Sequence, residues 1–179
     1  MGTYLYRLLG ACALDSGTYE GIEADRRPIV MVQAVATVVL SSLATGLGAM
    51  GMFQHRVSAF GFVTGLALVT WFCWAVLMLQ IGTRALPEPG TQADMGELLR
   101  TTGFAAAPGL LQAFAVLPGA TKLVFVGAWI WMVVAMIVAV RQALDFHTTR
   151  RAVAVCGVAA LLSLLMAFTL AALFAPTAS

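Results

Sequence analysis

Residues 28–53 form an apolar run without one charged side chain, and this run constrains the fold more than any other feature of the sequence. At 1.5 Å per residue, an α-helix of about 20 residues crosses the ~30 Å hydrocarbon layer of a bilayer. Arg26 and Arg27 stand directly before the run, and Pro28 suits the first turn of a helix. The run therefore predicts a transmembrane helix that begins at Pro28.

Four more apolar segments follow, and together they predict a membrane domain over residues 28–175. The expected spans are about 28–53, 57–85, 98–118, 122–143 and 152–175. Hydrophobic residues make up 61% of the chain and charged residues 10%, against about 45–50% and 25% in soluble domains. The expected fold class is therefore all-α, a polytopic membrane helical bundle. The net charge of +2, without a basic cluster larger than a pair, gives no indication of a nucleic-acid partner.

Residues 1–27 precede the first span and predict two short helices at the cytoplasmic membrane surface. Residues 4–9 are apolar apart from Arg7, are too few to span a bilayer, and suit a helix that lies at the interface. Asp15 can cap a second helix, with Leu14 and Tyr19 placed as a hydrophobic staple. A docking site for a partner is the alternative interpretation of this segment.

The interrupted segment 95–118 decides the topology. If it crosses the membrane and the N-terminus is cytoplasmic, eight basic residues lie inside and two, Arg56 and Lys122, lie outside. The eight inside are Arg7, Arg26, Arg27, Arg84, Arg100, Arg141, Arg150 and Arg151. If the segment only dipped into the membrane and returned, the split would be six to four. The positive-inside rule therefore favours five spans, with the C-terminus outside.

Pro108 interrupts the third segment because it cannot donate to the carbonyl of Phe104 and pushes against it. Gln112 lies one turn later on the same face, so Phe104, Pro108 and Gln112 predict a kink with a freed carbonyl and a buried amide. A neighbouring helix can satisfy these groups, or they can line a small cavity, as in transporters with interrupted helices. In the second span, Gly61 and Gly65 form a small-residue face for packing within the monomer or between copies.

Four charged residues are expected near the cytoplasmic ends of the third and fourth spans. Glu97 and Arg141 lie at equal distances from the turn at Pro118, and Asp145 follows Arg141 by one helical turn. Arg100 can extend along the helix toward Asp145. We therefore expect a linked set, Glu97–Arg141–Asp145–Arg100, that closes the hairpin. The alternative is that these are ordinary interfacial charges that serve only the topology.

Residues for catalysis or metal binding are not grouped in this sequence. The predicted topology places His55 and His147 on opposite sides of the membrane, and no ionisable side chain lies deep in a predicted span. The three cysteines cannot all pair, and Cys73 and Cys156 lie in apolar segments, which predicts reduced thiols. We expect no enzymatic activity, no cofactor and no metal.

The sequence resembles the bacterial Yip1-domain membrane proteins over nearly its whole length. The residues that carry the resemblance are Leu99-Arg100, Gly103-Phe104, residues 107–111 (APGLL), Pro118-Gly119, Trp131-Met132 and residues 139–145 (AVRQALD). The resemblance implies five membrane helices and no known enzymatic activity. Eukaryotic members engage Rab-type small GTPases, which we do not expect here because only 27 residues precede the first span.

Taken with the charge pattern, the resemblance favours a non-enzymatic scaffold or accessory subunit in the bacterial inner membrane. Its expected partners are the lipid bilayer and either another membrane protein or further copies of the chain. The alternative is a small channel or transporter for an ion or lipid, which would use the kinked third helix.

Overall fold

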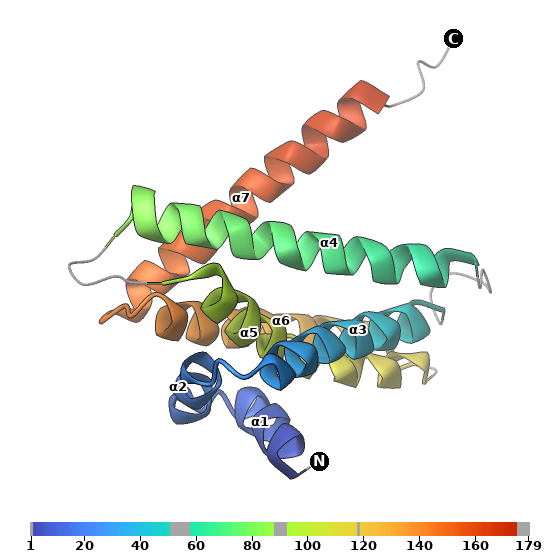
Figure 1. Ribbon diagram of the computed structural model, residues 1–179. Coiled ribbons are helices and arrows are strands. Elements are labelled where there is room, and N and C mark those ends of the chain that lie inside the picture. The colour runs from blue at the N-terminus through green and yellow to red at the C-terminus, as the bar shows by residue number, and fades with distance from the viewer. Residues whose placement is uncertain (1, 51–57, 88–92, 118, 175–179) are drawn as a thin grey trace.

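The protein is described here from a computed structural model that covers residues 2–50, 58–87, 93–117 and 119–174. These residues form seven α-helices, one π-helical turn and one 3-10 helix, with no strand among them. The chain is thus all-α, as predicted. Figure 1 shows α3, α4 and α6 lying roughly along one direction, with the short helices α1 and α2 on one flank and α7 leaving the group.

Two short helices open the chain. The first is α1 (Gly2–Cys12), and the second is α2 (Ser16–Ala24). The side chain of Asp15 accepts a hydrogen bond from the Thr18 amide at 2.9 Å, which confirms Asp15 as the N-cap of α2. Between the helices Leu14 has a φ of 59°, a left-handed conformation that reverses the chain. A Cβ at Gly10 would lie 2.2 Å from Oγ1 of Thr18, so the glycine lets the two helices approach closely.

Three helices carry segments that are long and apolar enough to cross a membrane, within the described part of the chain. They are α3 (Pro28–Met50), the end of α4 (Ser58–Gln80) with the π-helical turn η1 (Ile81–Ala85), and α6 (Thr121–Ala143). Their apolar segments are Pro28–Gly48, Leu68–Ala85 and Thr121–Ala143. The starts predicted at residues 28 and 122 agree with α3 and α6 to within one residue.

The third apolar segment is not one kinked α-helix. It consists of α5 (Met95–Ala105), capped by Asp94, and the 3-10 helix η2 (Ala107–Val116). The α-helical hydrogen bonding ends before Pro108, which lacks the N–H that would continue it and disfavours an α conformation in the preceding residue. Both parts pack against α3 and α6, so the broken segment lies in the middle of the bundle.

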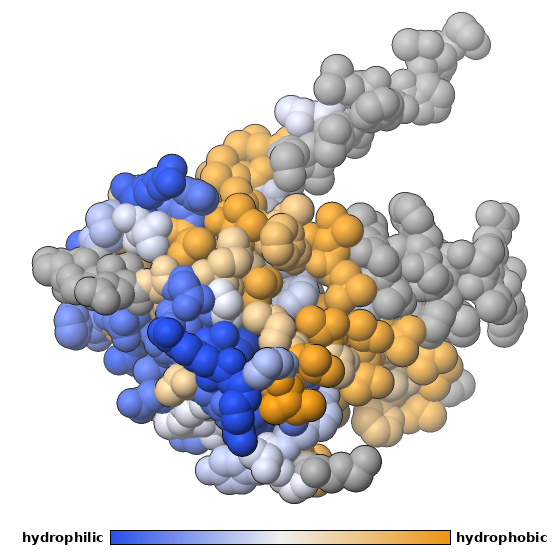
Figure 2. Space-filling model, in the orientation of Figure 1, coloured by the Kyte–Doolittle hydropathy of each residue, from blue (hydrophilic) through white to orange (hydrophobic). Residues whose placement is uncertain are grey.

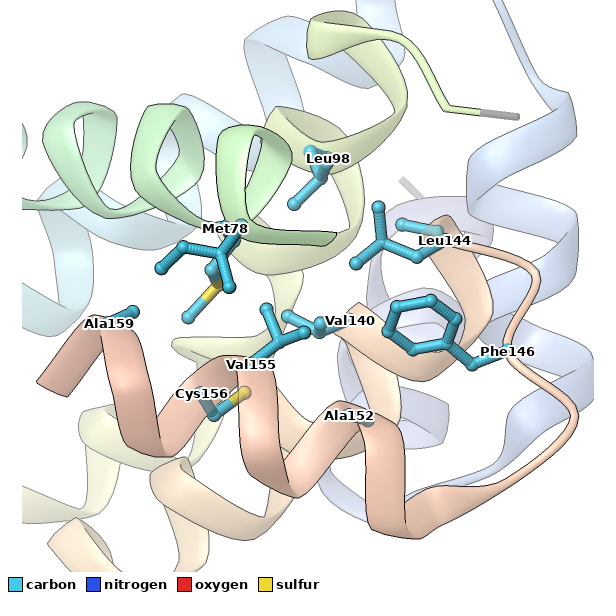
Figure 3. Close-up of a cluster of buried hydrophobic side chains, with 11 residues drawn as sticks. Met78, Leu98, Val140, Leu144, Phe146, Ala152, Val155, Cys156 and Ala159 are labelled. Carbon is cyan, nitrogen blue, oxygen red and sulfur yellow. The ribbon is translucent and has the colours of Figure 1, made fainter. Parts of the chain in front are cut away.

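Two apolar clusters hold these helices together. The first joins α4, η1, α5, α6 and the start of α7 (Thr149–Phe174). Figure 3 shows Met78, Leu98 and Leu144 around this cluster, with Val155 and Cys156 of α7 beneath them. The second joins α1, α2, α3, α5, η2 and α6 through Tyr19, Ile22, Phe104 and a set of small alanines. The N-terminal helices are therefore part of the packed core and not an appendage.

The surface separates into two halves. Figure 2 shows hydrophilic residues over the end of the molecule that carries α2 and the N-terminus of α5, and hydrophobic residues over much of the remaining coloured surface. Large apolar side chains are exposed along α3, α6 and the described part of α7, among them Val32, Trp129 and Leu164. Exposed apolar surface of this extent is typical of a protein that faces lipid. We call the hydrophilic half the charged end of the bundle.

Candidate functional site: the charged end and the broken third helix

Arg100 lies at the centre of the charged end and is 7% exposed. Its Nη2 donates to the carbonyl of Glu23 at 2.8 Å, and its Nε donates to the carbonyl of Ile22 at 3.4 Å. These carbonyls belong to the last turn of α2, where no later residue of the helix can satisfy them. A cation at a helix C-terminus is also favoured by the helix dipole. Arg100 therefore fastens α2 to α5.

Glu97 has two roles at the start of α5. Its Oε2 accepts from the backbone N–H of Asp94 at 3.0 Å, while Oδ1 of Asp94 accepts from the N–H of Glu97 at 2.8 Å, which completes a capping box. Its Oε1 accepts from Nη2 of Arg26 at 3.1 Å. Glu97 thereby joins α5 to the segment that connects α2 and α3.

The predicted network Glu97–Arg141–Asp145–Arg100 is therefore wrong in its partners. Among the described residues, no ion pair joins Glu97 to Arg141 or Arg100 to Asp145; Arg141 instead donates from Nε to the carbonyl of Phe146 at 3.4 Å. The prediction compared the depths of two α-helices, but a 3-10 helix rises about 2.0 Å per residue and shifts that register. It also could not include α2, which supplies the carbonyls for Arg100.

Two of the four residues do meet at a shallow pocket of about 520 Å³. Its lining residues are Glu23, Arg26, Thr83, Ala93, Asp94, Glu97 and Asp145. Oε2 of Glu23 is buried there without a hydrogen-bond partner. Burial, followed by repulsion from Asp145, Glu97 and Glu20, raises the pKa of Glu23 to about 7 against the attraction of Arg100. No group of three or more potential metal ligands is found among the described residues.

A second set of charges ties α1 to the start of α3. Arg7, whose side chain is 10% exposed, donates to Oδ2 of Asp25 at 2.5 Å and to Oε1 of Gln33 at 3.1 Å. Arg27 also donates to Asp25, with an Nη2–Oδ2 distance of 2.5 Å. Hydrogen bonds from Arg27 and then Arg7 hold the pKa of Asp25 well below its usual range. Nothing in the sequence apart from the charges themselves pointed to this cluster.

The broken third helix is satisfied by its neighbour. Phe104 and Gln112 are 0% and 3% exposed, and Pro108 is buried with them. Oγ of Ser41 on α3 donates to the carbonyl of Ala106 at 2.6 Å, and the hydroxyl of Thr45 donates to Oε1 of Gln112. The first of the two predicted arrangements, a break packed against another helix, describes this geometry. An apolar groove of about 340 Å³ beside it is lined by Leu111, Phe114, Val124, Gly127, Ala128 and Trp131, and by none of the three predicted residues.

The other predicted packing face stays untested. Gly61 and Gly65 belong to α4, but their surroundings lie outside the described residues. Close approach between helices is instead visible at Gly103 of α5, where an added Cβ would lie 2.8 Å from Cβ of Ala34. Gly103 thus lets α5 contact α3 directly.

An all-α membrane protein follows from these features: apolar helices of membrane-spanning length, an apolar outer surface, and an interrupted segment whose polar groups are satisfied by α3. The sequence matches the Yip1 domain over residues 17–171. Because the match covers most of the chain, the protein belongs to the Yip1 family, as its sequence motifs predicted. No curated protein and no solved structure matches the chain.

The packed break predicts different roles for two adjacent serines. Ser41 and Ser42 are both buried on α3, but Ser41 bonds to Ala106 across the interface while Ser42 bonds back to Val38 in its own helix. Ser41→Ala should lower the free energy of unfolding by about 1 kcal/mol, because a hydrogen bond between segments is lost. Ser42→Ala is the matched control and should have little effect. Thermal unfolding in detergent measures both, and equal losses would contradict the interface role of Ser41.

The position of Glu23 predicts a pH-dependent stability. Its folded pKa of about 7 lies above its ordinary value of 4.5, so the folded state holds the proton more tightly. The stability that protonation provides is present below pH 4.5 and is lost as the pH rises toward 7. Glu23→Gln should therefore unfold at a higher temperature than the natural chain at pH 8, with a smaller difference at pH 5. Glu20→Gln, on the exposed side of the same helix, is the control, because it removes only the weakest of the three repulsions on Glu23 and should therefore gain less. An equal gain in that variant would refute the assignment.

Proposed function

We propose that this Yip1-family protein is a non-enzymatic scaffold or accessory subunit that acts through binding in the membrane. The observation that carries the proposal is that charged side chains hold the N-terminal helices in fixed positions against the bundle. Arg100 and Glu97 hold α2 and the α2–α3 connection against α5, and Arg7 holds α1. The charged end is thereby a preformed polar surface, with the pocket between Glu23 and Asp145 open on it. Preformed surfaces lose little conformational entropy when they bind a partner.

The proposal includes five membrane crossings, formed by α3, α4 with η1, α5 with η2, α6 and α7. For the broken segment, the 11 residues of α5 rise about 1.5 Å each and the 10 residues of η2 about 2.0 Å each. Together they extend about 36 Å, more than the ~30 Å of the hydrocarbon layer. The wider rise of the 3-10 helix supports a full crossing by a segment that is not one continuous α-helix.

The orientation and location follow from the charge count. We place the charged end in the cytoplasm and the N-terminus on the same side of the bilayer, because Arg26, Arg27, Arg100 and Arg141 belong to that end. In a bacterium this membrane is the inner membrane. A channel or transporter at the third helix is not supported, since Phe104, Pro108 and Gln112 are buried and the amide of Gln112 has a partner on α3.

The topology predicts opposite accessibility for two positions. A cysteine introduced at Thr148, between α6 and α7, should react with an impermeant thiol reagent from the cytoplasmic side only. A cysteine at Ser179 should react from the other side only, because α7 lies between the two positions. The natural chain, with Cys12, Cys73 and Cys156, gives the background. Reaction of both positions from one side would exclude five crossings.

The function is tested by purification in mild detergent at native expression. A scaffold or accessory subunit should purify as a particle heavier than one chain in its detergent micelle, with either a distinct membrane protein or further copies of itself. Arg26→Ala, at the charged end, should reduce recovery of the partner more than Lys122→Ala does. Lys122 is an exposed cation at the start of α6, away from the charged end. A particle that contains one chain and no partner, together with solute flux through liposomes, would overturn the proposal.

A further inference from the structure

Helix α1 has an unusual distribution of polarity. Leu5, Tyr6 and Leu9 point outward, with 58%, 68% and 62% of their surface exposed. The one charged residue of the helix, Arg7, points inward and is 8% exposed. A helix at a protein–water boundary has the opposite arrangement, because leaving three large apolar side chains in water is unfavourable. The exposed side of α1 therefore suits an apolar environment.

The inward side of α1 is fully used by contacts within the chain. Arg7 binds Asp25 and Gln33, so its charge is compensated without water. Tyr4 packs edge-on against Phe104, with ring centroids 6.0 Å apart. Ala11 is buried against the second apolar cluster. The helix is thus fixed in one orientation, and its apolar side cannot turn toward the protein.

Two hydrogen bonds give the position of α1 along the bundle. The hydroxyl groups of Tyr4 and Thr37 lie 3.0 Å apart. Thr37 is nine residues beyond Pro28 on α3, a distance of about 14 Å along the helix axis. At the other end of α1, Nε1 of Trp131 donates to the carbonyl of Cys12 at 2.8 Å. Trp131 is twelve residues before Ala143, about 18 Å from that end of α6.

Both contacts lie near the middle of helices that have the length of a membrane crossing. The two hydrogen bonds place α1 beside α3 and α6, and its exposed apolar side chains lie at a similar depth to those of these two helices. Asp15 and Glu20 are exposed on the far side of the turn that follows Cys12, so the surface changes from apolar to charged between α1 and α2.

From this geometry we infer that α1 is an intramembrane helix that does not cross the bilayer, with Leu5, Tyr6 and Leu9 in contact with lipid acyl chains. This differs from the expected helix at the membrane surface, because α1 lies beside the spans and its charge is turned into the protein. The binding partner of this surface is the lipid of one leaflet. The inference needs neither a protein partner nor the scaffold role and stands apart from the proposed function.

Cysteine accessibility tests the inference. Leu5→Cys, Leu9→Cys and the matched control Glu20→Cys are each purified and reconstituted into phosphatidylcholine vesicles at a high lipid-to-protein ratio. Labelling by a charged, membrane-impermeant maleimide is measured above the background of the unsubstituted chain. Leu5→Cys and Leu9→Cys should react at least roughly tenfold more slowly than Glu20→Cys. The charged reagent stays in water, and moving an apolar part of α1 out of the lipid to meet it is unfavourable. All three should react equally after denaturation in detergent.

The outcomes separate the possible environments of α1. Reaction of Leu5→Cys or Leu9→Cys at the rate of Glu20→Cys would show that α1 faces water or a protein partner absent from the vesicles, and would overturn the inference. Protection that disappears when the lipid is increased tenfold would indicate contact with a second copy, which also overturns it. Because both leucines point away from the chain, the unfolding temperatures of the variants should match that of the natural protein.

Discussion

An interrupted backbone inside a membrane bundle must find hydrogen-bond partners within the protein, and much of this structure depends on that requirement. Lipid offers no donor to the carbonyls that a proline break sets free. The residues of α3 that face η2 include Ser41, Thr45 and Gly48, two hydroxyl donors and a residue without a side chain. A Cβ at Gly48 would lie 2.3 Å from the carbonyl oxygen of Gln112. The sequence of α3 is thus fitted to the break between α5 and η2.

The same close packing explains why the N-terminal helices are attached where they are. With α3, α5 and α6 in contact through small residues such as Gly103 and Ala135, a shallow surface remains on which Tyr19 and Ile22 of α2 are buried. Arg100 then reaches the last turn of α2 from inside the bundle. Burying this cation is favourable only because two carbonyls face it. Apolar packing places α2, and the guanidinium selects its orientation.

The sequence predicted those features that depend on neighbouring residues only. The run without charges located α3, and the residue pattern around Asp15 located the start of α2. It did not predict that α5 would continue as a 3-10 helix, because that conformation depends on contacts with α3 and α6. It also missed the partners of Arg100 and Glu97, which are supplied by segments more than 70 residues away. Pro108 correctly predicted where the helix breaks, but the 3-10 conformation that follows the break depends on contacts with α3 and α6.

The basic residues that indicate the topology are also part of the fold. Arg7, Arg26, Arg27 and Arg100 account for four of the eight cations expected on the cytoplasmic side, and each contacts a carboxylate or carbonyl in the structure. The positive-inside effect requires only that these charges stay on one side of the membrane. The structure requires more, because Arg7 must reach Asp25 and Arg100 must reach the end of α2. Lysine would keep the positive charge on that side of the membrane, but it lacks the planar set of donors with which Arg7 and Arg100 bind two groups each. The attachment of α1 and α2 to the bundle therefore depends on the geometry of the arginine side chain, and a count of charges alone does not predict this.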